Sequence, residues 1–166
     1  MISDIELVIR LLEASFLGGV IGWERERFNK PAGLRTNMLV CLGTALIIIY
    51  AENSFPVADS WARVASGVIT GIGFLGAGAI MQSQKGIRGL TTAATIWVVA
   101  IIGMAVGGGQ LIAAAASTFI VLLILFFSSI EEKVISVGLP DVTWFRTRHL
   151  HLSRKPYLKS KRNGRG

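Results

Sequence analysis

An uncharged run of 42 residues, at positions 89–130, constrains the fold of this chain more than any other feature of its sequence. As a helix at about 1.5 Å per residue it would extend roughly 63 Å, about twice the roughly 30 Å hydrocarbon thickness of a bilayer. The mean hydropathy of the chain is +0.58, and 52% of its residues are hydrophobic while 16% are charged. This balance excludes an ordinary water-soluble domain, a disordered chain and, with one cysteine, a disulfide-stapled module. The sequence therefore predicts an all-α membrane protein.

Glycines and charged residues divide the sequence into five apolar segments, each near the roughly 17 to 25 residues that a membrane-spanning helix needs. The first three are expected at 5–22, 36–51 and 64–84. The long uncharged run divides at 107–110, where three adjacent glycines form a turn at little steric cost. The first segment is expected to be retained, since Asp4 and Glu6 stand where a cleavable signal carries positive charge.

Basic residues are concentrated in alternate loops. The loops after the first and third segments contain Arg25, Arg27, Lys30, Arg35, Lys85 and Arg88. Nine more follow the fifth segment, so 15 of the 17 Lys and Arg residues lie on one side. Positively charged loops stay in the cytoplasm, which predicts an outside N-terminus and a cytoplasmic C-terminus.

We expect two parts, a transmembrane domain at 1–132 and a basic cytoplasmic tail at 133–166. Residues 131–166 contribute +6 of the net charge of +7, which favours anionic lipid as a partner. Nucleic acid is not an expected partner, because the basic segment is tethered to a bilayer and has no nucleic-acid-binding fold. Within the tail we expect an interfacial aromatic anchor at 144–145, a strand start at 142–152, solvated histidines at 149 and 151, and disorder from 154 to 166.

One stretch, residues 16–21 followed by 33–36, resembles a second stretch, residues 74–80 followed by 89–92. The first parts of the two stretches are 58 positions apart, and their second parts are 56 positions apart. They predict two parallel helical hairpins, although chance similarity between glycine-rich helices is the alternative. The second and fourth segments would then both begin with threonine, a frequent helix N-cap. Beside Arg35, Lys85 and Arg88, these helix starts could hold an anionic group. Alternatively, the threonines only cap helices and the charges only set topology.

The third segment contains a G-x-G-x-x-G pattern at 71–76. A dinucleotide site is not expected, because no strand precedes the pattern. Gly67, Gly71 and Gly78 fall within about 40° on a helix of 3.6 residues per turn, which predicts a close helix contact. The packing residues expected on this segment are Gly67, Gly71, Gly73, Gly76 and Gly78.

Arg10 and Glu13 are charged residues inside the first segment, three positions apart. Arg10, roughly 8 Å into the membrane at 1.5 Å per residue, can reach the interface, whereas Glu13 lies near mid-membrane. An intramembrane carboxylate is costly and suggests a functional site; an Arg10–Glu13 ion pair that fixes helix packing is the alternative. The sequence has no Walker loop, zinc H-E-x-x-H or G-x-S-x-G pattern. We therefore expect no enzyme activity, metal site or cofactor.

Five blocks of sequence resemble the MgtC/SapB membrane protein family. They read IGWERER at 21–27, KPAGLRTN at 30–37, residues 39–42, ASGVITGIGFLGAGAI at 65–80 and RGLTTAATIWV at 88–98. The resemblance covers residues 5 to about 130 and implies a bacterial inner-membrane protein with about five spans. It also implies links to growth under magnesium limitation, survival inside host cells and, for one member, restraint of the membrane ATP synthase. Candidate anion or partner contacts at the cytoplasmic end are Glu24, Arg25, Arg27, Arg35, Asn37, Arg88, Thr91 and Thr92.

Two departures from the family pattern point to the wider family. Members of the namesake type continue into a folded cytoplasmic domain, whereas 36 residues follow Ile130 here. Thr91 and Val98 stand where the namesake has Asn and Cys. The leading hypothesis is a non-enzymatic membrane regulator that contacts a larger complex such as the ATP synthase. The alternative is a small magnesium or other ion transporter. Magnesium prefers octahedral oxygen ligands and the membrane interior offers one carboxylate, Glu13, although a homo-oligomer would multiply it.

Overall fold

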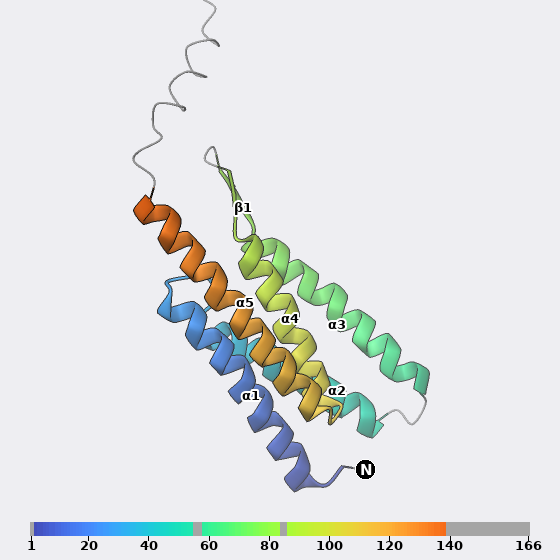
Figure 1. Cartoon of the computed structure of the whole chain (residues 1–166). Coiled ribbons are helices and arrows are strands. Elements are labelled where there is room, and N and C mark those ends of the chain that lie inside the picture. The colour runs from blue at the N-terminus through green and yellow to red at the C-terminus, as the bar shows by residue number, and fades with distance from the viewer. Residues whose placement is uncertain (1, 55–57, 84–85, 139–166) are drawn as a thin grey trace, which may run out of the picture. The chain divides into compact units, whose positions relative to one another are not determined.

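The computed structural model describes residues 2–54, 58–83 and 86–138. These residues form five helices and a short hairpin (Figure 1). The elements are α1 Asp4–Arg27, α2 Leu34–Ser54, α3 Ala58–Ala79, β1 Met81–Ser83, β2 Gly86–Arg88, α4 Leu90–Gly107 and α5 Leu111–Gly138. Contacts divide the chain into two units, Met1–Ser129 and Ile130–Gly166. The first unit contains α1 to α4 and α5 as far as Ser129. The expectations for residues 139–166 lie outside the described part of the chain.

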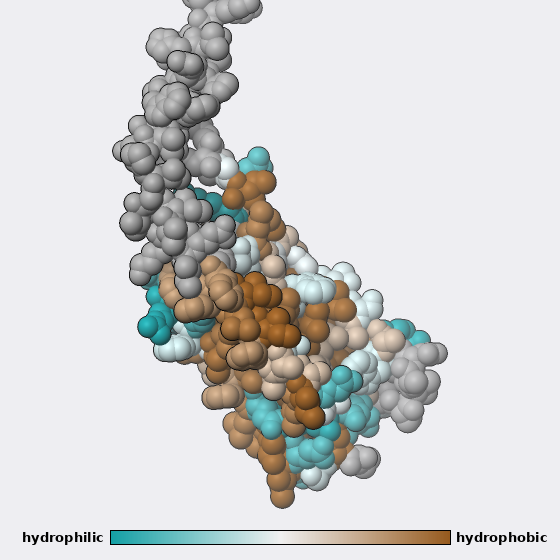
Figure 2. Space-filling view, viewed as in Figure 1, coloured by the Kyte–Doolittle hydropathy of each residue, from teal (hydrophilic) through white to brown (hydrophobic). Residues whose placement is uncertain are grey.

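Three helical segments are long and apolar enough to cross a membrane: Leu34–Ser54, Trp61–Ala79 and Leu90–Gly107. A further apolar stretch of α5, Leu111–Phe127, is shorter. Large apolar side chains also face outward, including Phe16, Ile112 and Phe119, and Figure 2 shows apolar surface over much of the visible face. Water would not solvate such a surface well. The predicted all-α membrane class is confirmed.

Successive helices of the first unit run in opposite directions, so their connections gather at two ends (Figure 1). One end, here called the basic end, holds the α1–α2 connection at 28–33 and the β1–β2 hairpin. The other, here called the N-terminal end, holds the beginning of α1 and the ends of α2 and α4. Hydrogen bonds join the helices at both ends. Arg25 of α1 donates to Thr92 of α4 at the basic end, and Arg10 of α1 donates to Glu52 of α2 at the N-terminal end.

The core of the first unit lies between α1, α2 and α4, with Ala114 and Leu125 of α5 joining it. Glycines let the backbones approach closely. A Cβ at Gly18 would lie 2.7 Å from Cβ of Cys41, and a Cβ at Gly107 would lie 2.6 Å from the Ala45 carbonyl oxygen. The buried side chains around these contacts include Ile21, Ile48, Val99, Ile102 and Val106.

The two helical hairpins repeat one contact. An added Cβ at Gly18 would lie 2.6 Å from the carbonyl oxygen of Asn37, and one at Gly76 would lie 3.7 Å from Cβ of Ala93. Gly76 follows Gly18 by 58 positions and Ala93 follows Asn37 by 56, which are the offsets of the sequence repeat. This correspondence supports the predicted pair of hairpin units.

Several expected boundaries are wrong. α1 continues to Arg27 instead of ending at 22, because its polar last turn, Glu24 to Arg27, consists of good helix formers. α3 ends at Ala79 instead of 84, because residues from Met81 on pair as β1 and β2. α5 continues past 130 to Gly138.

The predicted threonine N-caps are also wrong. Thr36 lies inside α2, which begins at Leu34, and Thr91 and Thr92 lie inside α4. The N-cap of α4 is Gly89, whose φ of 90° favours glycine.

Candidate functional site

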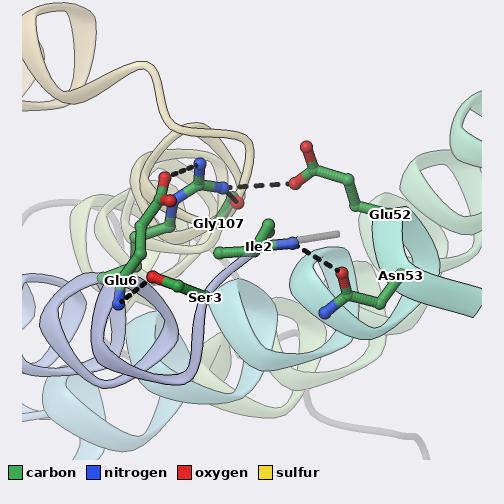
Figure 3. Close-up of polar contacts among 7 residues, drawn as sticks. Ile2, Ser3, Glu6, Glu52, Asn53 and Gly107 are labelled. Carbon is green, nitrogen blue, oxygen red and sulfur yellow. Dashed lines mark hydrogen bonds and ion pairs between the residues drawn. The ribbon is translucent and has the colours of Figure 1, made fainter.

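At the N-terminal end, Arg10 of α1 connects three helices, and Figure 3 shows its partners Glu6, Glu52 and Gly107. Its Nη2 lies 2.6 Å from Oε1 of Glu6, one turn earlier in α1. Its Nη1 donates to Oε2 of Glu52 on α2 at 3.2 Å and to the carbonyl oxygen of Gly107 at the end of α4 at 2.7 Å. A cation at the C-terminus of α4 also interacts favourably with the helix dipole. We call Arg10, Glu6, Glu52 and Gly107 the Arg10 cluster.

The Arg10–Glu13 ion pair, the alternative interpretation of these two charges, does not form, since Arg10 pairs with Glu6 and Glu52. Helical side chains lean toward the N-terminus, so the Arg10 guanidinium reaches back to Glu6 and away from Glu13. Glu13 is half-buried, and its Oε2 is buried without a hydrogen-bond partner among the described residues. The structure therefore separates the two charged side chains of α1 that the sequence placed together.

At the basic end, buried polar side chains hold the α1–α2 connection. Asn37 is fully buried, and its Nδ2 donates to the carbonyl oxygens of Ala32 and Gly33, the latter at 2.9 Å. Ala32 has a φ of 55°, which an L-residue rarely adopts. The Glu26 carboxylate accepts the Leu34 N–H at 3.0 Å and so satisfies one free donor at the start of α2.

Arg25 joins this end of α1 to α4. Its side chain is buried, and Nη2 donates to Oγ1 of Thr92 at 3.2 Å. Glu24, next to it in sequence, is also buried. Of the predicted cytoplasmic candidates, Glu24, Arg25, Asn37 and Thr92 are thus parts of the helix packing.

The other predicted candidates at this end are exposed. Arg27 lies over the Trp23 ring, with 5.5 Å from its guanidinium carbon to the ring centroid, a cation–π distance. Arg35 and Thr91 face outward on the first turns of α2 and α4, and Arg88 is exposed on β2. These exposed side chains are available for a partner or an anion.

The glycines of α3 behave differently from those of the core. A Cβ at Gly67, Gly71, Gly73 or Gly78 would meet nothing within 4 Å, whereas Gly76 contacts Ala93 of α4. The predicted close packing is therefore made within this chain by Gly76 and not by the other four. Gly67, Gly71 and Gly78 fall within about 40° of one another around the helix and are here called the α3 glycine face.

Sequence reasoning missed the glycines that do pack the core. Gly18 and Gly22 contact α2, and Gly103 and Gly107 contact it from α4. Both pairs have the G-x-x-x-G spacing that favours close helix packing, so this signal was present in the sequence. Glu52, the partner of Arg10 from α2, has no comparable local signal.

Comparisons with known proteins identify a family and several relatives of this chain. The MgtC family profile matches residues 11–133. "Protein MgtC" of Salmonella typhimurium (strain LT2) is 47% identical over 100 residues, which cover 60% of this chain and 42% of that protein. "Putative magnesium transporter YhiD" of Escherichia coli (strain K12) is 45% identical over 109 residues, 61% of this chain and 51% of that protein. "Protein SrpB" of Synechococcus elongatus is 41% identical over 114 residues, 61% of this chain and 63% of that protein.

The matches to these curated relatives span about half of their length. No solved structure matches the chain. The family profile covers most of the sequence, from the first turns of α1 into the last turns of α5. On this evidence, the chain belongs to the MgtC family.

Proposed function

We propose that this protein is a non-enzymatic regulator in the bacterial inner membrane, with its N-terminus outside, that acts by lateral helix contact with a larger membrane complex. Family membership and the names of the relatives support a magnesium-related membrane function. The regulator hypothesis adds that the protein acts under magnesium limitation and during survival in host cells. The ATP synthase is the candidate complex that the family resemblance implies.

One observation carries this proposal, the outward α3 glycine face. The apolar window of α3 is 11% buried inside the first unit, whereas that of α4 is 56% buried. Transmembrane helices associate through small residues that let backbones approach closely. A partner helix could therefore approach α3 near Gly67 and Gly71, and the exposed Arg35 and Arg88 would provide polar contacts at the basic end.

Replacing one glycine of this face tests the proposal against a matched control. Gly71→Leu places a branched side chain in the face, and Gly43→Leu places the same side chain on α2, where an added Cβ also meets open space. We expect ATP synthase subunits to co-purify in mild detergent with the parent and with Gly43→Leu, and to be lost with Gly71→Leu. Equal recovery with both variants, or no recovery with the parent, would contradict the proposal.

Ion transport is the second candidate function, and Glu13 favours it. Its buried Oε2 lacks a hydrogen-bond partner among the described residues, and Arg10 forms ion pairs elsewhere. Magnesium takes oxygen ligands in octahedral geometry, so several copies would have to contribute Glu13.

Vesicles containing the purified protein and a magnesium-sensitive dye test this alternative. Transport predicts a protein-dependent flux that Glu13→Gln abolishes and that Asp4→Asn, an acid-to-amide change in the first turn of the same helix, leaves intact. Absence of flux, or a flux that Glu13→Gln leaves unchanged, would contradict a Glu13-dependent transporter.

A further inference from the structure

A largely apolar groove opens between α2, α3 and α4 at the basic end of the first unit. Its volume is about 430 Å³, and its walls include Val40 of α2, Phe74 and Leu75 of α3 and Ile96 of α4. Phe74 and Leu75 are 83% and 51% exposed, so the groove is open to the surroundings of the helices. Thr36 and Val40 of α2 both line the groove, so it extends roughly 6 Å along α2 at 1.5 Å per residue.

A polar cavity of about 710 Å³ adjoins this groove, because Pro31 and Thr36 line both. Its walls carry Lys30, Arg35 and Glu26. The formal charge of these three side chains is +1, since two cations accompany one carboxylate. Glu26 is already engaged, because it accepts the Leu34 N–H.

Arg35 is the side chain best placed to bind a ligand in the polar cavity. It is exposed and makes no hydrogen bond or ion pair with any residue that the structure describes. A second cation lies behind the apolar groove, because the buried Arg25 donates to Thr92, which lines the groove. The polar cavity thus has cations in its wall, whereas the groove wall itself is uncharged and has Arg25 behind it at Thr92.

We infer that the two cavities together bind one anionic phospholipid. Its phosphate lies beside Lys30 and Arg35, and part of one acyl chain lies along Val40, Phe74 and Ile96. The charge of +1 in the polar cavity complements the single negative charge of a phosphodiester, and the apolar walls give a hydrocarbon chain a dry contact surface. A protein helix fits less well, because roughly 6 Å of groove corresponds to about one helical turn.

Lipid binding by the purified full chain tests the inference. The probes are phosphatidylglycerol, phosphatidylcholine with the same acyl chains, and glycerol phosphate as the soluble head group. We expect preferential binding of phosphatidylglycerol, measured as bound lipid per protein by native mass spectrometry from detergent. Equal binding of phosphatidylcholine would overturn the charge argument, and equally tight, competing binding of glycerol phosphate would overturn the role of the groove.

Two variants locate the site, each with its control. Arg35→Gln should weaken phosphatidylglycerol binding about fivefold, since one basic residue near a membrane contributes about 1 kcal/mol and 1.4 kcal/mol is tenfold. Arg27→Gln removes the same charge at the same end but outside both cavities, and should leave binding unchanged. Gly78→Leu fills the groove that Gly78 lines, whereas Gly67→Leu adds the same side chain elsewhere on α3.

We expect Gly78→Leu to displace the lipid and Gly67→Leu to retain it. Thermal unfolding of each variant in the same detergent identifies any that fails to fold. If a folded Gly78→Leu protein binds phosphatidylglycerol as well as Gly67→Leu does, the groove does not hold the acyl chain and the inference is wrong. Equal losses with Arg35→Gln and Arg27→Gln would show diffuse surface charge in place of a site.

Discussion

The guanidinium of Arg10 lies 3.2 Å from the carboxylate of Glu52, 42 positions further along the chain. The same Nη1 donates to the Gly107 carbonyl oxygen, 97 positions away. One side chain in α1 therefore fixes the ends of α2 and α4 at the N-terminal end. Its position also leaves Glu13 without the partner that sequence spacing had suggested.

Arg10→Gln should destabilise the protein more than Glu52→Gln does. The Arg10 side chain is 12% exposed and holds three partners, whereas the Glu52 side chain is 41% exposed. We expect Arg10→Gln to lower the free energy of unfolding by about 1 to 3 kcal/mol, the usual cost of depriving a buried group of its partner. Glu52→Gln should lower the free energy of unfolding by less than about 1 kcal/mol, because an exposed ion pair contributes no more than that to stability.

Thermal unfolding in detergent, followed by circular dichroism, compares these variants. Glu13→Gln is the control, because Arg10 does not pair with Glu13. A loss with Glu13→Gln as large as that with Arg10→Gln would mean that Glu13 also contributes to the ion pairing.

Gly103→Ala should lower the free energy of unfolding and Gly71→Ala should not, although both replace a helical glycine. A Cβ at Gly103 would overlap Oγ1 of Thr44 and the Cys41 carbonyl oxygen, whereas a Cβ at Gly71 meets open space. We expect Gly103→Ala to cost about 1 to 3 kcal/mol through overpacking. Gly71→Ala should have no cost and could gain up to about 1 kcal/mol, because alanine favours helix. Equal midpoints in thermal unfolding of the two variants would contradict the helix packing described here.

The broad architecture could be predicted from the sequence because it follows from solvation. Five apolar segments and alternating basic loops are summed properties of many residues, so errors at single positions cancel. Boundaries depend on local competition instead. The helix-forming residues up to Arg27 extend α1, and the pairing of Met81 with Arg88 ends α3 early, effects that hydropathy does not report.

The candidate sites were harder to predict, because they depend on which helix faces which. Glu24, Arg25 and Asn37 carry polar side chains in loop-like sequence, yet the structure buries them between helices. The packing of Gly18 and the openness of Gly71 likewise depend on neighbours that the sequence does not identify. Arg10 could be recognised as unusual, but its partner Glu52 required the three-dimensional structure.

Asn37→Leu should destabilise the α1–α2 connection. The amide Nδ2 donates to the carbonyl oxygens of Ala32 and Gly33, while Gly33 also accepts the Asn37 backbone N–H at 3.2 Å. Leucine has a similar size but would leave the Ala32 carbonyl oxygen without this donor. We expect this loss to lower the free energy of unfolding by about 1 to 3 kcal/mol. Thr36→Val, an exposed change on the same turn, should stay within about 0.5 kcal/mol. Thermal unfolding that shows no difference between the two would contradict this role for Asn37.

The two ends of the first unit should differ in their accessibility from outside the cell. Ser54 ends α2 at the N-terminal end, and Gln82 lies on β1 at the basic end; both are exposed. In a Cys41→Ser background, we expect Ser54→Cys to react with a membrane-impermeant maleimide in intact cells whose outer barrier admits the reagent. Gln82→Cys should react only after the inner membrane is permeabilised, because basic loops are retained in the cytoplasm. Cys41 itself is fully buried, so the unmodified chain should not react until it is denatured. Labelling of Gln82→Cys and protection of Ser54→Cys in intact cells would reverse the proposed orientation and would place the lipid groove in the outer leaflet.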